Sequence, residues 1–210
     1  MYALVESGTI TKYFNNPKGF TLGDLQYPAD IFMKWSVEEK QAIGIYEVIF
    51  NDSNKKDEKW YINTNQSFVF ANDTVTASYG TAFPKAHADT LWTQKNSDDG
   101  DLPDDKSVGD VATRGLKYNL IRDLKTNVAN ELAKTDWYIT RKTEKSTAIP
   151  SSISTHRDAV RTKQAQMETA ITNASDTPAL ETLYTYVNTA AAGDPKVYAR
   201  PLGELEVLEL

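Results

Sequence analysis

The chain has 210 residues and a formal charge of −6 at pH 7, from 23 basic and 29 acidic side chains. Proteins that bind nucleic acid need clustered Lys and Arg to displace counterions from phosphates, so this charge excludes an extended nucleic-acid interface. The absence of cysteine excludes disulfides, thiolate nucleophiles and the common structural zinc sites.

Length and hydropathy set further limits. Folded domains usually have about 100 to 150 residues, so the chain can hold one large domain or one ordinary domain with an appendage. No stretch of 18 residues is uninterruptedly apolar, and the N-terminus lacks a basic region followed by an apolar one. We therefore expect no membrane span and no standard secretion signal.

The first 95 residues are predicted to be rich in β-strands. Tyr2–Glu6 and Thr9–Phe14 are β-branched or aromatic runs on either side of Ser7 and Gly8, which is typical of a β-hairpin. The next stretch, 15–30, collects Gly, Pro, Asn and Asp and is a predicted loop.

A short helix and a small sheet are expected next. Ser36 and Glu39 have the spacing of a capping box, and Gly44 suits the exit of the helix. The following runs IYEVIF, KWYINT and VTASYG predict a mostly antiparallel sheet, because the links between them are too short for the crossovers of parallel strands. The side chains expected on its inner face are Ile45, Val48, Trp60, Ile62, Phe68, Phe70, Val75 and Tyr79.

A change of composition follows at residues 96–110, which contain six aspartates, two glycines and a proline. This composition is typical of a solvated linker. Calcium is a weaker interpretation: an EF-hand loop needs Gly at its sixth position and Glu at its twelfth. Counting from Asp99, those positions hold Asp104 and Asp110.

Beyond this segment the pattern is helical. Apolar residues recur every four positions over Arg114–Lys134, which predicts an amphipathic helix of about 30 Å. The residues in this stripe are Leu116, Leu120, Leu124, Val128 and Leu132.

A second helix is predicted from about Pro150 to Asn173, with a narrow seam typical of packing on one neighbour. Its seam residues are Ile153, Val160, Met167 and Ala174. A third, short helix begins with Thr177 as the expected N-cap.

These elements predict an α+β protein. We expect a small, mostly antiparallel β-rich docking domain over 1–95 and an acidic linker over 96–112. A helical domain over 113–190 then holds a helical hairpin and the short third helix, and a tail with exposed leucines covers 191–210.

The motifs do not predict catalysis. His87 and His156 lie far apart in the sequence and outside any H-x-x-x-H or H-E-x-x-H pattern, so we interpret them as surface or interface histidines. Neither a G-x-S-x-G elbow nor a phosphate-binding glycine loop is present. Carboxylate pairs could serve a glycosidase only if the fold set their separation. We expect no enzymatic activity, no cofactor and no metal.

The stretch TDWYITRKTEKSTAIPSSISTHRDAVR, between the two long helices, is the predicted interaction site or joint. Its Thr135 and Asp136 can terminate the first helix, and Pro150 can restart the chain as the second. Trp137 and Tyr138 could form an apolar plug or, alternatively, a platform for sugars. Arg157 and Arg161 share a helix face and could reach Asp136 or the acids of a partner. The residues of this site are Leu132, Thr135, Asp136, Trp137, Tyr138, Pro150, His156, Arg157 and Arg161.

The same region resembles the C-terminal module of tailed-bacteriophage tail proteins, described as tail assembly chaperones or tail fibre assembly proteins. The shared pattern is Leu-x-x-Thr-Asp-Trp at the end of one helix, a loop to a Pro, and a second helix with two Arg. The stretches MYALVESGTITKY, YPAD and GIYEV look like the small β domain that precedes this module. The chain differs from the common form at His156, where Tyr is frequent, and in a longer segment, Thr140–Ile149.

This resemblance implies a non-enzymatic structural protein of the virion, at the tail, baseplate or fibre attachment, assembled in the host cytoplasm. The implied partners are other phage structural proteins and further copies of the chain, with no nucleic acid and no membrane. One alternative is a tail or tail fibre assembly chaperone that is not retained in the virion. A minor alternative is a carbohydrate-binding or hydrolytic tail module.

Overall fold

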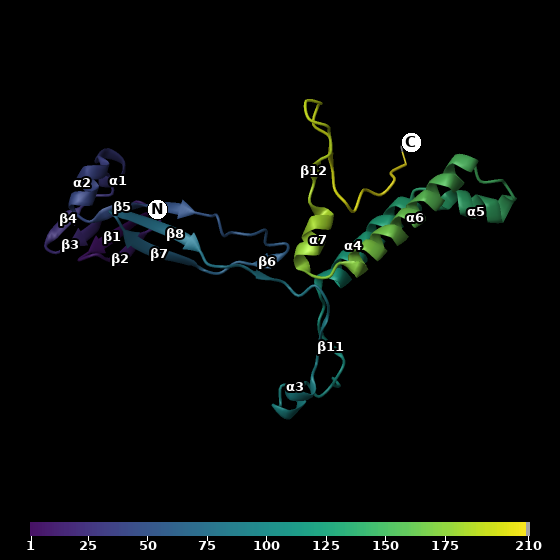
Figure 1. The fold of residues 1–210 in the computed structure, drawn as a ribbon, viewed down its shortest axis with the longest axis horizontal. Helices are drawn as coiled ribbons and strands as arrows, with labels where there is room; N and C mark the ends of the chain where they lie inside the picture. The colour runs from purple at the N-terminus through teal and green to yellow at the C-terminus, as the bar shows by residue number, and fades with distance from the viewer. Residues whose placement is uncertain (209–210) are drawn as a thin grey trace. The chain divides into compact units, whose positions relative to one another are not determined.

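The computed structural model describes residues 1–208 and shows an α+β protein, as expected, with most strands in the N-terminal half and the long helices in the C-terminal half (Figure 1). The chain divides into two compact units, Met1–Phe83 and Pro84–Leu210. We call them the β unit and the helical unit. The expected linker range, 96–112, lies inside the helical unit.

The β unit is built on a five-stranded sheet with the strand order β2-β1-β5-β8-β7. Its strands are β1 (Tyr2–Glu6), β2 (Thr9–Phe14), β5 (Ile45–Asn51), β7 (Gln66–Ala71) and β8 (Thr74–Tyr79). The β1–β2 hairpin was expected, and its turn residues Ser7 and Gly8 both have positive φ. All pairs are antiparallel except β5 with β8. After β5 the chain runs to the far edge of the sheet and forms β7, and a hairpin then returns it as β8 between β7 and β5. Strand β8 therefore runs in the same direction as β5.

Both faces of this sheet are covered by apolar side chains. Side chains alternate between the two faces of a strand, so Leu4 joins one cluster with Phe14 and Phe32, while its neighbours Ala3 and Val5 join another with Val48 and Val75. The edge strands β2 and β7 approach each other through the Tyr13 and Phe68 rings, whose centroids are 4.7 Å apart. The sheet therefore curls around its second cluster.

The predicted inner face of the sheet is partly correct. Ile45, Val48, Trp60 and Val75 are buried, but Ile45 and Val48 belong to different clusters and hence to opposite faces. Ile62 is 58% exposed, so the prediction was wrong there.

The remaining elements of the β unit are short. They are β3 (Phe20–Leu22), β4 (Leu25–Tyr27), α1 (Ile31–Lys34), α2 (Val37–Ala42), β6 (Tyr61–Ile62) and β9 (Phe83–Pro84), which ends across the unit boundary. Ser36 forms the expected capping box, since it accepts from the Glu39 amide while the Glu39 carboxylate accepts from the Ser36 amide. The predicted loop 15–30 was wrong in part, because β3 and β4 pair within it.

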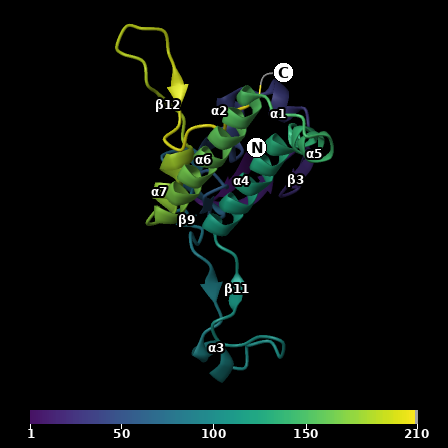
Figure 2. The same ribbon diagram turned by 90° about the vertical axis from the view of Figure 1, so that its right-hand side faces the viewer.

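Two long antiparallel helices form the core of the helical unit, α4 (Leu116–Ala133) and α6 (Ser151–Asn173) (Figure 2). Near one end the Lys117 ammonium donates to the Thr172 carbonyl at 2.8 Å. Leucines and a valine of α4 are buried against α6, whose expected seam is also buried: Ile153, Val160, Met167 and Ala174. One shorter helix follows each long one in sequence: α5 (Asp136–Lys145) follows α4 and α7 (Thr177–Tyr184) follows α6. The N-cap of α7 is Asp176 rather than the predicted Thr177.

Residues 84–115 lead into α4 and hold the acidic segment 96–110. The segment lies between β10 (Thr90–Leu91) and β11 (Val111–Thr113), which pair antiparallel, and it begins within the short helix α3 (Gln94–Asp98). The start of α4 is closed by Asp89, which accepts from the Gly115 amide at 2.8 Å and pairs with Arg114 at 2.6 Å. Both contacts lower the pKa of Asp89, and the hydrogen bond from the Gly115 amide has the larger effect.

The C-terminal segment is held by the helical unit. After the two-stranded ribbon of β12 (Val187–Asn188) and β13 (Tyr198–Ala199), the Leu202 side chain is buried and its amide donates to the Leu183 carbonyl at 3.0 Å. The expectation of exposed leucines is therefore wrong at Leu202; the expected leucine at position 210 lies outside the described residues. Over residues 1–208, no helix is long and apolar enough to cross a membrane.

Candidate interaction site

Arg157 of α6 organises the predicted joint. Its side chain is only 10% exposed, and its Nη1 donates to the Leu132 carbonyl at 2.8 Å, to the Thr135 hydroxyl at 2.6 Å and to the Asp136 carboxylate at 2.9 Å. Leu132 lies in the last turn of α4 and Asp136 is the first residue of α5. A single guanidinium thus fastens the end of α4 and the start of α5 to α6.

Thr135 is fully buried between the two helices that it separates. Its hydroxyl donates to the Leu132 carbonyl at 3.0 Å, and its amide donates to the same carbonyl at 3.1 Å. The last carbonyls of a helix have no partner within the helix, so these bonds and the one from Arg157 together satisfy the Leu132 carbonyl.

Glu131, which the sequence analysis did not select, forms a second buried network beside Arg157. Its carboxylate accepts from Lys134 at 2.6 Å, from the Leu208 amide at 2.8 Å and contacts the His156 ring at 3.2 Å. The Lys134 hydrogen bond and then the Leu208 amide lower the pKa of Glu131. Through this carboxylate the C-terminal segment is tied to both long helices. The sequence signal was a charged residue seven positions after Leu124, on the apolar face of α4.

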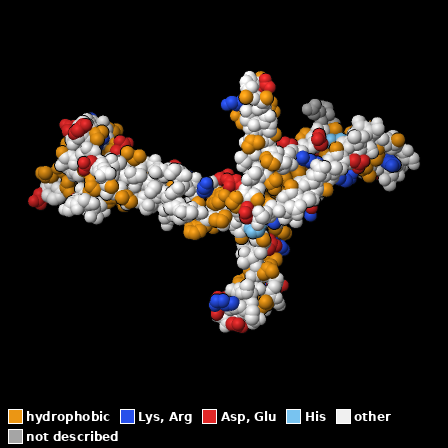
Figure 3. Space-filling model, in the orientation of Figure 1, with side chains coloured by type: hydrophobic (Ala, Val, Ile, Leu, Met, Phe, Trp, Pro, Cys, Tyr) orange, Lys and Arg blue, Asp and Glu red, His pale blue; other side chains and the backbone are white. Residues whose placement is uncertain are grey.

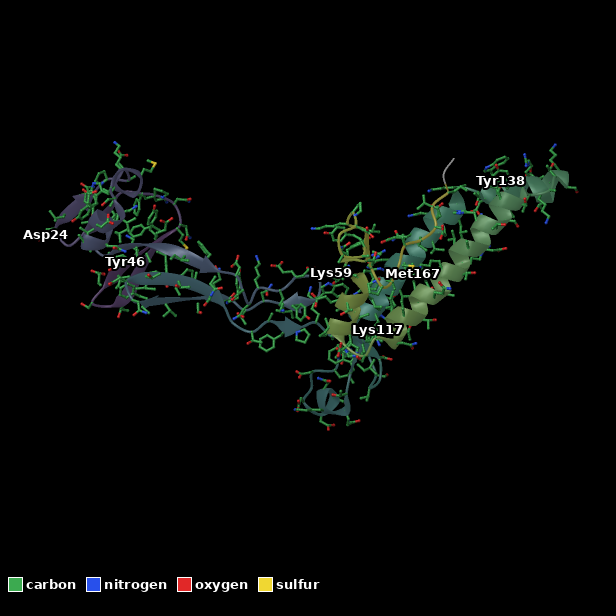
Figure 4. All side chains as sticks on the ribbon, turned by 45° about the horizontal axis from the view of Figure 1, so that its top comes forward. Asp24, Tyr46, Lys59, Lys117, Tyr138 and Met167 are labelled. Atoms are coloured by element: carbon green, nitrogen blue, oxygen red, sulfur yellow. The ribbon has the colours of Figure 1, made fainter. Side chains whose placement is uncertain are left out.

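Trp137 and Tyr138 form an exposed aromatic cluster at the start of α5. Their ring centroids are 3.8 Å apart, and the Arg141 guanidinium lies over both rings, 4.7 Å from Trp137 and 5.2 Å from Tyr138. Trp137 is 51% exposed, so it is not the buried plug that was one of the two expectations. Arg141 was also missed by the sequence analysis. We call Trp137, Tyr138 and Arg141 the aromatic cluster; Figure 4 shows Tyr138 at the end of the helical unit opposite Lys117.

The other predicted site residues occupy separate places. Pro150 is the N-cap of α6. Arg161 is half exposed and pairs with Asp158 of its own helix at 3.5 Å, so it does not reach Asp136. Among the nine predicted residues, Leu132, Thr135, Asp136 and Arg157 are the ones that share one network.

The helical unit also carries an open groove along α4, with a volume of about 530 Å³. It is lined by Tyr118, Ile121, Arg122, Lys125, Thr126 and Ala129. In the described part of the chain, no group of three or more His, Asp or Glu is arranged to hold a metal ion. The end of the helical unit that carries α5 therefore offers an aromatic and cationic surface on a helix whose first residue is held by the Arg157 network.

No protein-family model, no curated protein and no solved structure matched the chain.

Proposed function

We propose that the chain is a non-enzymatic structural protein of a bacteriophage virion, located at the tail, baseplate or fibre attachment, and that it acts by docking on other proteins. The resemblance of the segment from Leu120 to Ile171 to phage tail modules supplies the context. One structural observation carries the docking role: an exposed aromatic cluster is mounted on a buried hydrogen-bond network.

Trp, Tyr and Arg are the residues that most often dominate binding energy at protein interfaces. Trp137, Tyr138 and Arg141 combine all three, and Trp137 keeps 51% of its surface exposed. The Arg157 network holds the first residue of the helix that carries them, which lowers the ordering entropy lost when a partner covers the cluster. This combination supports a preformed interaction surface.

Within this proposal the antiparallel helices α4 and α6 act as a helical hairpin that presents α5 at one end. The acidic segment 96–110 acts as a solvated connection, in which Asp101 and Asp104 form no ion pair with any residue from 1 to 208. The β unit supplies a separate docking surface.

The proposal is tested by mass spectrometry of virions purified through a density gradient, from cells that produce the phage encoding this chain. We expect the chain to sediment with intact particles in a fixed ratio to the tail proteins. Its absence from particles together with its presence in the lysate would support the alternative, an assembly chaperone that leaves. A Trp137→Ala phage tests the surface itself, since we expect fewer copies of the chain per particle.

A carbohydrate-binding role is the minor alternative, favoured only by the exposed Trp137 ring. Sugars stack on aromatic faces, but here Arg141 already covers the Trp137 and Tyr138 rings. Titration of the purified chain with host-surface glycans, followed by tryptophan fluorescence, separates the two roles. A saturable change lost in Trp137→Ala would favour the sugar.

A further inference from the structure

Helix α5 carries exposed apolar side chains on a support that is too short to be stable alone. It has ten residues, none of them buried, and Trp137 and Ile139 are 51% and 40% exposed. Isolated helices shorter than about 12 to 15 residues are marginal in water. Burial of the exposed side of α5 by a partner would therefore stabilise the helix as well as the contact.

The charges of α5 indicate what kind of partner fits. Arg141, Lys142 and Lys145 form no ion pair with any residue from 1 to 208, and Asp136 is already engaged by Arg157. The Arg141 Nε atom is buried and lacks a hydrogen-bond acceptor in the same part of the chain. Figure 3 shows Lys and Arg side chains on the part of the helical unit that carries α5. An acidic segment with some apolar surface would complement this helix.

The chain itself contains such a segment. Residues 96–110 carry six aspartates against one lysine, and Val108 within them is 47% exposed. Asp101 and Asp104 form no ion pair within the described residues. Residues 96–110 therefore offer carboxylates and an apolar side chain, which complement the cationic and aromatic side chains of α5.

Geometry prevents the two surfaces of one copy from meeting. The acidic segment precedes the N-terminal end of α4 and α5 follows its C-terminal end. The 18 residues of α4 span about 27 Å at about 1.5 Å per residue. Figure 1 shows the segment around α3 projecting away from the helices at one end and α5 lying at the other. Only a second copy can bring the two surfaces together.

We propose that the helical unit associates head to tail, with the acidic segment 96–110 of one copy docked on α5 of the next. The inference rests on the proposed function, because it names a second copy as the partner of the same aromatic and cationic surface. Two different surfaces are joined in each contact, so the association generates a closed ring or an open chain, depending on the rotation between copies.

Charge-reversal variants test this contact by sedimentation of the purified full-length chain, whose monomer has a mass of 23.5 kDa. The concentration of the chain is varied from about 100 μM to 1 mM at low salt, because a small, charged interface is expected to be weak. The average mass of the wild type should rise with concentration beyond that of a dimer. Asp101→Lys with Asp104→Lys, or Lys142→Glu with Lys145→Glu, should each weaken association by at least about tenfold, since like charges then face each other.

Mixing the two double variants provides the decisive measurement. Lysines at 101 and 104 of one variant then face glutamates at 142 and 145 of the other, while the unchanged surfaces also remain complementary. We expect the mixture to recover association to near the wild-type level. Circular dichroism should show that each variant keeps its helix content, because the reversed side chains are exposed.

The control is Arg122→Glu with Lys125→Glu, which makes the same change of charge on the groove of α4. These side chains pair with Asp123 and Glu168, so circular dichroism of the control also has to show the helix content of the wild type. This control should associate like the wild type. A wild type that stays monomeric at low salt, a mixture that does not recover, or an equal loss in the control would overturn the inference. A chain that is monomeric in solution but present in purified virions would overturn the head-to-tail contact while leaving the proposed function in place.

Discussion

At the scale of single residues, Arg157 is the side chain on which the joint depends most. Replacing it with Met keeps much of its apolar stem but removes the charged donor that the Leu132 carbonyl, the Thr135 hydroxyl and the Asp136 carboxylate share, while the Leu132 carbonyl keeps its bonds from Thr135. Hydrogen bonds to charged groups contribute about 1.5 to 3 kcal/mol to stability. We expect Arg157→Met to lower the free energy of unfolding by about 3 kcal/mol, measured by urea denaturation followed by circular dichroism.

The control for this change is Arg161→Met on the same helix. Arg161 is half exposed and, among residues 1–208, pairs with Asp158 alone, so its loss should change the free energy of unfolding by no more than about 0.5 kcal/mol. Equal effects of the two substitutions would show that the Arg157 network contributes nothing beyond a surface charge.

Trp137 gives the opposite expectation. A buried tryptophan replaced by alanine costs about 3 to 5 kcal/mol, but this ring is 51% exposed. We expect Trp137→Ala to lower the free energy of unfolding by less than about 1.5 kcal/mol, mainly through the lost contact with Tyr138 and Arg141. Thermal unfolding of the purified chain measures this, and a loss near the value for a buried ring would contradict an exposed interaction surface.

Glu131 makes the stability of the helical unit depend on pH. The pKa of its carboxyl is lowered in the folded state, first by Lys134 and then by the Leu208 amide. A lowered folded-state pKa means that the stabilisation is present above the unfolded-state pKa and is lost as pH falls through the folded value.

Thermal unfolding between about pH 6 and pH 3, a range that spans the ordinary glutamate pKa, checks this dependence. The melting temperature of Glu131→Gln should fall less steeply with decreasing pH than that of the wild type. Parallel curves would show that Glu131 is not linked to folding.

At the scale of elements, the sequence predicted those helices whose apolar residues repeat regularly. The four-residue spacing from Leu116 to Leu132 located α4, and the seven-residue seam located α6, because burial against one neighbour requires such spacing. Helix α5 was missed since none of its residues is buried, so no apolar period marks it. The Asp89 cap of α4 was also missed because its partner Gly115 is 26 residues away.

The candidate site divides in the same way. Arg157, Thr135 and Asp136 were selected because short polar residues after a helix and an arginine on the next helix can meet across a joint, and these side chains share one network. The exposure of Trp137 depends on how α5 leaves that joint, which residue types alone do not specify. Glu131 was missed since its role requires the Leu208 amide, 77 residues later in the chain.

The C-terminal segment is an element without regular structure whose packing can be tested. Leu202 is 4% exposed, whereas Val207 in the same segment is 65% exposed. We expect Leu202→Ala to lower the free energy of unfolding of the helical unit by about 2 to 4 kcal/mol, through lost burial and the cavity that remains. Val207→Ala is the control and should change it by less than about 0.5 kcal/mol. Similar, small effects of both would show that the segment is not docked.

At the scale of the whole molecule, composition and contacts divide the chain at different places. The change in composition begins at residue 96, whereas the compact units meet between Phe83 and Pro84. Residues 85–89 belong to the helical unit because its helices use their backbone and side chains. The Thr177 hydroxyl donates to the Lys85 carbonyl at 2.6 Å, and Asp89 caps α4. A change in composition shows where the charge of the sequence changes. It does not show which residues form hydrogen bonds with the helices, so it does not locate the boundary of the helical unit.

This difference predicts how fragments of the chain behave. A fragment of residues 84–210 keeps the Lys85 carbonyl, the Asp89 carboxylate and the carbonyls of residues 86 and 87, to which the first two amides of α4 donate. A fragment of residues 113–210 starts after all of them and leaves the Gly115 amide, those two amides and the buried Thr177 hydroxyl without these acceptors. We expect the free energy of unfolding of the shorter fragment to be about 2 to 4 kcal/mol lower than that of the longer one. A lost cap and a buried unpaired hydroxyl each cost about 1 to 2 kcal/mol. Urea denaturation of the two fragments measures the difference. Asp89→Ala in the longer fragment separates the cap from the rest and should account for about 1 kcal/mol of it. Equal stability of both fragments would place the boundary at the acidic segment, where the composition changes.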